Sequence, residues 1–165
     1  MTTVKQDIQR AIKSMLVKYT NCPADRILSA YNNKVPLPTD NDYIIITLLT
    51  PTRLGTPIVE HTIDSDTSYQ DYKLTVQIDF YGQFAFDRAC DIINISRTPF
   101  LCDFLKEYGV QPIASEEAIN LTGISGEKEY VDRYMVRLEI DYRDAVIVSQ
   151  DGFNTAKLNI FATEF

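Results

Sequence analysis

Histidine is the side chain that most often acts as a general base near neutral pH, and His61 is the only histidine in the chain of 165 residues. A histidine-based triad, dyad or zinc motif would therefore have to be built around it. His61 lies in a segment expected to form a hairpin strand, and no carboxylate stands near it at the spacing that such sites use. We interpret His61 as a partly exposed strand residue. A hydrolase that uses His61 remains an alternative that loss of an activity in His61→Ala would support.

Three other kinds of pattern resemble functional sites only in part. The segment 123–128 (GISGEK) lacks the glycine and lysine spacing with which a phosphate loop cradles its ligand. The triplets 40–42 (DND) and 64–66 (DSD) lack the glycine and the distal glutamate of a calcium loop, so we interpret them as turns. The paired acids at 116–117 and 127–129 lie in expected loops and are interpreted as surface charge. We predict no catalytic residue, no cofactor and no metal.

The cysteines and the composition indicate one ordinary globular domain. Cys22, Cys90 and Cys102 are odd in number and form no CxxC or Cys/His pattern, so we expect three reduced, buried thiols. The chain is 45% hydrophobic and 24% charged, and no linker interrupts it. We therefore expect a single domain over residues 1–165.

The charge distribution argues against direct binding of nucleic acid. The net charge is −7, and no two basic residues are adjacent, so the basic patch of a phosphate-binding protein is missing. An acidic chain can still surround DNA without holding it, because like charges repel. No stretch is long and apolar enough to span a membrane, and we expect the protein to stay in the cytosol where it is made.

Helical periodicity is clearest at the amino terminus. Apolar residues spaced by three and four from Thr3 to Tyr19 predict an amphipathic helix. A second, short helix is expected over Ala24 to Tyr31, after Pro23. Residues 84–96 repeat the helical spacing, and Thr98-Pro99 supplies an N-cap and a first-turn proline for a helix that ends at Gly109.

Strand periodicity appears in several segments. Residues 43–49 are β-branched and predict a buried strand, and 58–63 would follow as one strand of a hairpin arm with a polar tip at 64–66. The segments 71–80 and 130–142 alternate apolar and polar residues and predict two long strands, each with one face towards the core. A loop is expected over 111–126. Residues 143–165 are expected to form a terminal β-hairpin, from strands at 145–148 and 156–161.

These elements predict an α+β fold, in which an antiparallel β-sheet carries α-helices on one face and has protruding β-hairpins. Large side chains also occur on the nominally polar side of the strands, at Tyr69, Tyr81, Val131 and Met135. A sheet that exposes several large side chains on an uncovered face often pairs with another subunit.

Three segments of the chain carry a resemblance to a known family. They are 79–82 (DFYG), 85–89 (AFDRA) and 126–134 (GEKEYVDRY). The chain resembles the phage neck terminator family, relatives of tail-terminator proteins, in which a long strand ends in a Phe-Tyr-Gly-like corner. A helix with an Ala-x3-Ala pattern follows there, and a later strand opens with an Asp/Glu-Arg pair. The likeness runs in order from the amino-terminal helix through the strand that ends near Tyr142.

The resemblance implies a structural subunit of a virion neck, made in the host cytoplasm. It implies a ring, a hexamer, that caps the tail tube, joins it to head-completion proteins and lets DNA pass through its lumen. Closed rings require each copy to present different patches to its two neighbours. From the residues we predict that the patches include Tyr69, Tyr81 and Met135 on the sheet face, and Leu158, Ile160 and Phe161 in the terminal hairpin.

An alternative from another class is a non-enzymatic, small-molecule-binding α+β domain of host or prophage origin. It would hold its ligand in a concave apolar cavity between the sheet and the helices, and it would be a monomer or a dimer. Size-exclusion chromatography with light scattering separates the two hypotheses.

Overall fold

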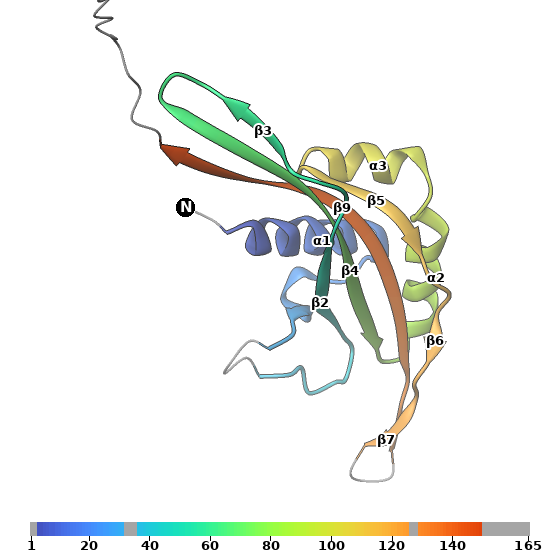
Figure 1. The fold of residues 1–165 in the computed structure, drawn as a ribbon. Helices are drawn as coiled ribbons and strands as arrows, with labels where there is room; N and C mark the ends of the chain where they lie inside the picture. Colours follow the sequence, from blue (N-terminus) through green and yellow to red (C-terminus); the bar gives the residue numbers. More distant parts are fainter. Residues whose placement is uncertain (1–2, 32–35, 126–128, 150–165) are drawn as a thin grey trace, which may run out of the picture.

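The fold is that of a computed structural model, which describes residues 3–31, 36–125 and 129–149 (Figure 1). Its first helix, α1 (Val4–Thr20), begins where the sequence predicts. The Thr3 hydroxyl accepts a hydrogen bond from the backbone N–H of Gln6, and the Gln6 side chain accepts one from the backbone N–H of Thr3. This capping box satisfies two backbone donors and fixes the start of the helix. The predicted apolar stripe of α1 is buried from Ile8 to Leu16, whereas Val4 at its start is exposed.

A mixed β-sheet forms the centre of the molecule. Its strands follow the order β1-β2-β4-β9-β5, with β3 paired to β4 and β6 paired to β9. The bounds are β1 (Ile27–Ser29), β2 (Tyr43–Arg53), β3 (Ile58–His61), β4 (Ser65–Tyr81), β5 (Val110–Ser115), β6 (Ile119–Asn120) and β9 (Arg133–Ser149). The pair β1 and β2 is parallel, and the other pairs of this sheet are antiparallel. The strands β7 (Gly123–Ser125) and β8 (Glu129–Val131) form a separate small hairpin.

The helices α1, α2 (Ala85–Ile95) and α3 (Pro99–Lys106) pack on one face of this sheet. The core lies between them, where alternate residues of β4 and β9 meet the apolar sides of the helices. Fully buried examples are Phe80 and Ile78 of β4, Leu138 of β9, and Ile12 of α1. The expected α+β fold with helices on one face is confirmed, and so are the predicted helices that became α2 and α3.

Two predicted segments are wrong. The expected helix over Ala24 to Tyr31 is a single 3-10 turn (Ala24–Arg26) followed by β1, which pairs in parallel with β2. The expected loop over 111–126 contains β5, β6 and β7. The strand β7 pairs with the nearby β8. The strands β1, β5 and β6 are short, and they form because an edge of β2 or β9 offers backbone hydrogen bonds. That partner is distant in sequence and leaves no local periodicity.

The strands β4 and β9 are longer than their alternation predicts. Each has 17 residues, and they pair along their whole length, from Ser65 opposite Ser149 to Tyr81 opposite Arg133. Residues 145–148, expected to be a strand of a terminal hairpin, are the end of β9. The remainder of that hairpin, including the predicted turn at 150–152, lies outside the described residues. The pair extends well beyond the helices as a projecting ribbon (Figure 1).

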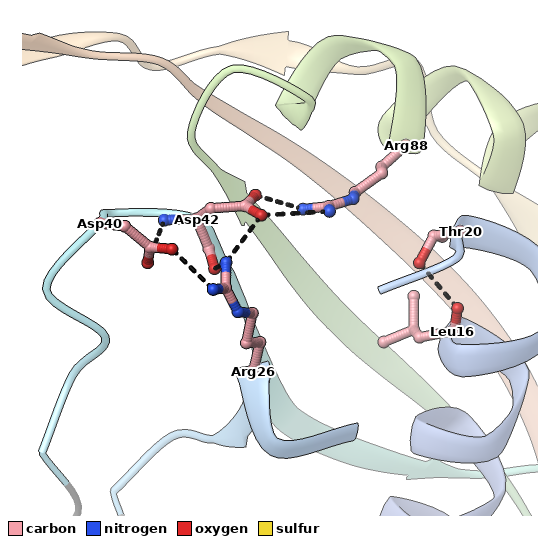
Figure 2. Close-up of polar contacts among 6 residues, drawn as sticks. All are labelled: Leu16, Thr20, Arg26, Asp40, Asp42 and Arg88. Atoms are coloured by element: carbon pink, nitrogen blue, oxygen red, sulfur yellow. Dashed lines mark hydrogen bonds and ion pairs between the residues drawn. The ribbon is translucent and has the colours of Figure 1, made fainter. Parts of the chain in front are cut away.

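A cluster of two arginines and two aspartates holds the chain before β2 against α2 (Figure 2). The Asp42 carboxylate accepts hydrogen bonds from Arg88 at 2.6 Å and from Arg26 at 3.1 Å, and Asp40 pairs with Arg26 at 2.7 Å. Gly82 closes the corner with a φ of +94°, where an added Cβ would lie 2.9 Å from the backbone of Asn41. The residues 40–42, expected to be only a turn, therefore also link two elements.

Candidate functional site

The sheet face opposite the helices carries rows of charged pairs across β4 and β9. Arg143 donates to both carboxylate oxygens of Asp71, at 2.6 and 2.9 Å, and Lys73 pairs with Glu139 at 2.9 Å. The paired hydrogen bond of Arg143 lowers the pKa of Asp71 from its ordinary value. The charged residues that the sequence places on this polar face are therefore largely ion-paired across the two strands.

Tyr81 marks the end of this face where β4 meets Gly82. Its ring stacks on Tyr43, with centroids 4.5 Å apart, and the Arg133 guanidinium lies 5.4 Å from the ring centre. Arg133 is held there by Asp79, which accepts from its Nε at 3.1 Å and from its Nη2 at 2.8 Å. Burial raises the pKa of the Tyr81 hydroxyl, and Arg133 lowers it only in part. Tyr81 is thus a fixed aromatic platform with a charged neighbour.

A cavity of about 240 Å³ opens beside this platform, between the ends of β2 and β4 and the β7–β8 hairpin. Tyr43, Tyr81 and Arg133 form one side of it, and Leu121 and Val131 contribute apolar surface. A space of this size fits a side chain or a short peptide segment of a partner rather than a large cofactor. An aromatic and arginine lining is typical of the central contacts of protein interfaces.

The other predicted interface residues differ in their exposure. Tyr69 is half-buried, and the Arg143 guanidinium lies 6.0 Å from its ring centre. Met135 is 7% exposed, so it has little surface to present to a neighbour. Tyr69 and Tyr81 stand on the same side of β4, and Met135 is directly opposite Asp79 on that side, as the alternation predicted. Leu158, Ile160 and Phe161 lie outside the described residues. The interface role of these six residues stays a prediction.

Two polar atoms on this face are buried without a hydrogen-bond partner among the described residues. They are Nε of Arg137 and Oδ1 of Asp141, both in β9. Burial raises the pKa of Asp141, and the nearby charge of Asp71 raises it further. An unsatisfied buried polar atom costs free energy, and a partner that supplies hydrogen bonds relieves this cost. Sequence alternation places both residues on the polar side, but it cannot show their burial.

A second surface lies on the helical side. The groove between α1 and α3 has a volume of about 380 Å³ and is lined by Arg10, Lys13 and Lys18 together with Phe104 and Tyr108. The Lys18 ammonium sits 4.4 Å from the ring centre of Phe104. This groove is basic although the chain as a whole carries a net charge of −7. This basic groove is therefore unlike the sheet face, where the charges are largely paired with one another.

The described residues contain no arrangement suited to metal or histidine chemistry. No group of three or more His, Cys, Asp or Glu side chains among them could hold a metal ion. His61 does have a carboxylate neighbour, because its Nδ1 lies 2.7 Å from Asp66 across the β3–β4 hairpin, and the sequence spacing did not predict this. The pair is exposed on a strand, where water competes with any proton transfer. The described cysteines form no disulfide.

The described helices include none that is long and apolar enough to cross a membrane.

Comparison with known protein families shows to which family the chain belongs. A family model described as "Phage neck terminator protein" matches residues 6–164. The chain belongs to the phage neck terminator family. The matched range includes α2, α3, all strands of the described sheet, and α1 except for its first two residues. No curated protein matches the chain at a significant level.

Membership of the phage neck terminator family confirms the resemblance predicted from the sequence. It assigns the chain to the structural proteins of the bacteriophage neck and tail, which assemble with other tail and head proteins of the virion. Assembly of this kind depends on contacts between protein surfaces. The Tyr81 platform, the unsatisfied polar atoms of β9 and the basic groove are the described features that such contacts can use.

Proposed function

We propose that this phage neck terminator protein forms a closed ring, a hexamer, that caps the finished tail tube and joins it to head-completion proteins. The match of the family model over residues 6–164 carries the proposal. DNA passes through the lumen of the ring without being held, and an excess of seven negative charges suits such a wall. The protein catalyses nothing in this role.

The differing sides of the molecule support a ring with two distinct faces. A ring that binds the last tube layer with one face and offers an unlike face opposite removes the template for further stacking. The ion-paired sheet side and the basic α1–α3 groove are unlike in charge and shape. Elongation then ends because no tube subunit finds its own contact surface on the far side.

The space between the sheet and the helices is where the alternative, a small-molecule-binding domain, would hold its ligand. That hypothesis needs a concave cavity there, but this space is filled by fully buried side chains such as Phe80, Leu105 and Leu138. A hollow of about 340 Å³ remains at the rim of this space, between the start of α1 and the strands β2 and β9, but the centre of the space is a packed core.

Growth of tail tubes in the presence of the protein tests the proposal. Purified tail tube protein is polymerised alone, with this protein, and with its Tyr81→Ala variant, and tube lengths and ends are measured by electron microscopy. We expect shorter tubes that end in a ring with the native chain, and a weaker effect with the variant. Tubes of unchanged length and bare ends at saturating protein would contradict the proposal.

A further inference from the structure

The projecting ribbon extends beyond the part of the sheet that the helices cover (Figure 1). It consists of β3 with its turn into β4 (58–73) and the end of β9 (141–149), and we call it the arm. No side chain of the arm is buried, whereas the next pair along the strands, Leu74 and Ile140, is buried completely or nearly so. A three-stranded sheet without a covered face lacks the burial that normally stabilises a sheet.

Apart from Ile63 in the turn, the exposed large aliphatic side chains of the arm lie on its two edge strands. Val146, Ile147 and Val148 stand on β9, and Ile58 and Val59 stand on β3. The central strand between them, residues 65–73 (SDTSYQDYK), is polar except for its two tyrosines. Soluble proteins usually protect a free edge with charged side chains, above all lysine, with proline or with a bulge. Along 58–61 and 144–149 the arm has no lysine, proline or bulge, and its only Asp, Glu, Lys or Arg side chains there are Glu60 and Asp144. The composition favours strand addition at both edges.

Both edges also have unused backbone groups among the described strands. On β9, the pairing with β5 ends where Val110 meets Tyr142, so residues 143–149 have no partner on that side. On the opposite edge, β3 pairs with β4 alone. Unpaired strand edges recruit further strands through main-chain hydrogen bonds, and apolar side chains add affinity.

The direction of the strands decides how copies can join. The strands β3 and β9 are each antiparallel to β4, so they run parallel to one another. Rotation about a ring axis preserves the direction of a strand along that axis. The β9 edge of one copy can therefore meet the β3 edge of the next copy only as a parallel pair. An antiparallel pair of two β9 edges would instead create a two-fold dimer and stop there.

We propose that a second copy of this chain occupies the arm, with residues 144–148 of one copy paired in parallel to β3 of the next around the ring. This inference rests on the proposed ring. The join brings Val146 and Ile147 beside the Ile58 and Val59 of the neighbour and covers the exposed apolar residues of both edges. Repeated around the axis, the arms form one continuous sheet that encloses part of the lumen.

Cross-linking in assembled rings tests this join. In a background in which the three cysteines are replaced by alanine, Val59→Cys and Val146→Cys are made in separate chains, and circular dichroism checks that both fold. The rings, alone or on tail tubes, are treated with a short bis-maleimide. We expect cross-linked dimers in an equimolar mixture at several times the yield of either chain alone. Single cysteines at 145–148 scanned against 58–61 then find the register.

The outcomes separate this inference from the proposed function. Rings that electron microscopy shows clearly but that give no mixed cross-link in the whole scan overturn the arm join and leave the ring in place. Dimers of Val146→Cys alone overturn it in favour of a two-fold contact. Cross-links within one chain between position 146 and a cysteine placed in 156–161 overturn it in favour of the chain's own terminal segment. Absence of rings on and off tubes overturns the proposed function itself.

A matched pair of lysine substitutions gives a second readout. Val146 and Leu37 are similarly exposed, at 58% and 56%, but only Val146 lies on the arm. Val146→Lys places a charge in the join, and we expect the concentration needed for half-maximal ring formation to rise about tenfold. Leu37→Lys should leave it unchanged. Equal effects of the two substitutions on rings of normally folded protein would contradict the arm join.

Discussion

Arg88 Nη1 lies 2.6 Å from Oδ1 of Asp42, and this ion pair joins α2 to the chain that leads into β2. Arg88 is 7% exposed, although it is an arginine on a surface helix. Removing one partner of a buried pair leaves the other charge without compensation. The contact is therefore a structural link on which the position of β2, and with it the Tyr43–Tyr81 stack, depends.

Asp42→Ala should lower the free energy of unfolding by about 3 kcal/mol, because it strands the Arg88 guanidinium. Asp40→Ala is the matched control, since Asp40 forms its ion pair with the more exposed Arg26 and accepts only a long hydrogen bond, 3.4 Å, from the backbone N–H of Asp42. Its loss should cost less than about 1 kcal/mol. Urea unfolding followed by circular dichroism measures both. Similar costs for the two substitutions would show that the Arg88 contact is not the important one.

Gly82→Ala should destabilise the fold more than Gly55→Ala. Both glycines have positive φ, which costs an L-residue about 1 kcal/mol or more. At Gly82 the new Cβ would also meet backbone atoms of Asn41 and Asp42 at 2.9 Å, whereas at Gly55 no atom lies within 4 Å. We expect a loss of about 3 kcal/mol at Gly82 and about 1 kcal/mol at Gly55 in urea unfolding. Equal losses would mean that the corner can relax.

Two aspartates of β4 and β9 should give opposite pH dependences. Burial raises the pKa of Asp141, so the folded protein keeps this proton to higher pH than the unfolded chain does, and stability falls as pH rises through that interval. Asp141→Asn should therefore stabilise the protein at neutral pH, and the gain should shrink as pH falls towards the ordinary value for an aspartate.

The Arg143 hydrogen bond lowers the pKa of Asp71, so its contribution is present above the ordinary aspartate value and is lost as pH falls towards the lowered one. Asp71→Asn should therefore destabilise at neutral pH and make little difference in acid. Urea midpoints of both variants between pH 3 and 8 measure the effects, relative to the native chain. The same sign for the two variants at neutral pH would contradict this assignment.

Met135 and Tyr69 separate stability from assembly. Met135 is buried, so Met135→Ala should lower the free energy of unfolding by about 2 to 3 kcal/mol. Tyr69 lies on the arm and is half-buried, so Tyr69→Ala should weaken ring formation and change unfolding little. Urea unfolding and light scattering measure the two properties. A loss of rings without loss of stability in Met135→Ala would instead place Met135 at a contact between copies.

The sequence predicts best the elements whose periodicity arises from contact with the core. The helix α1 and the inner halves of β4 and β9 each show one apolar face, and their expected and observed bounds agree closely there. The outer half of β4 is polar because it touches no core, so alternation ends there although the strand continues to Ser65. The short strands β1 and β5 form by pairing with strands distant in the sequence, and their own residues show no periodicity that would predict a strand.

The sequence predicted which face of the sheet carries the candidate site, but not the contacts between the residues of the site. Strand parity correctly places Tyr69 and Tyr81 on one side of β4. The stack with Tyr43 and the hydrogen bonds of Arg133 to Asp79 depend on the pairing register, which a sequence does not show. The exposed apolar edges of the arm could not be predicted for the same reason. Val146 to Val148 lie on a free edge because the pairing of β9 with β5 ends at Tyr142 of β9, opposite Val110.

The pair formed by Leu74 and Ile140 also divides the molecule into two parts that should differ in how strongly their backbone amides are protected from hydrogen exchange. Backbone amides on the helix-covered side of this pair exchange with solvent only when the whole domain opens, whereas those beyond it are released by fraying from the tip. The strands β4 and β9 continue without a break through this pair. A contact that holds their free ends in place therefore also restrains their pairing beneath the helices. Assembly should therefore raise the unfolding temperature of each subunit above that of the isolated subunit.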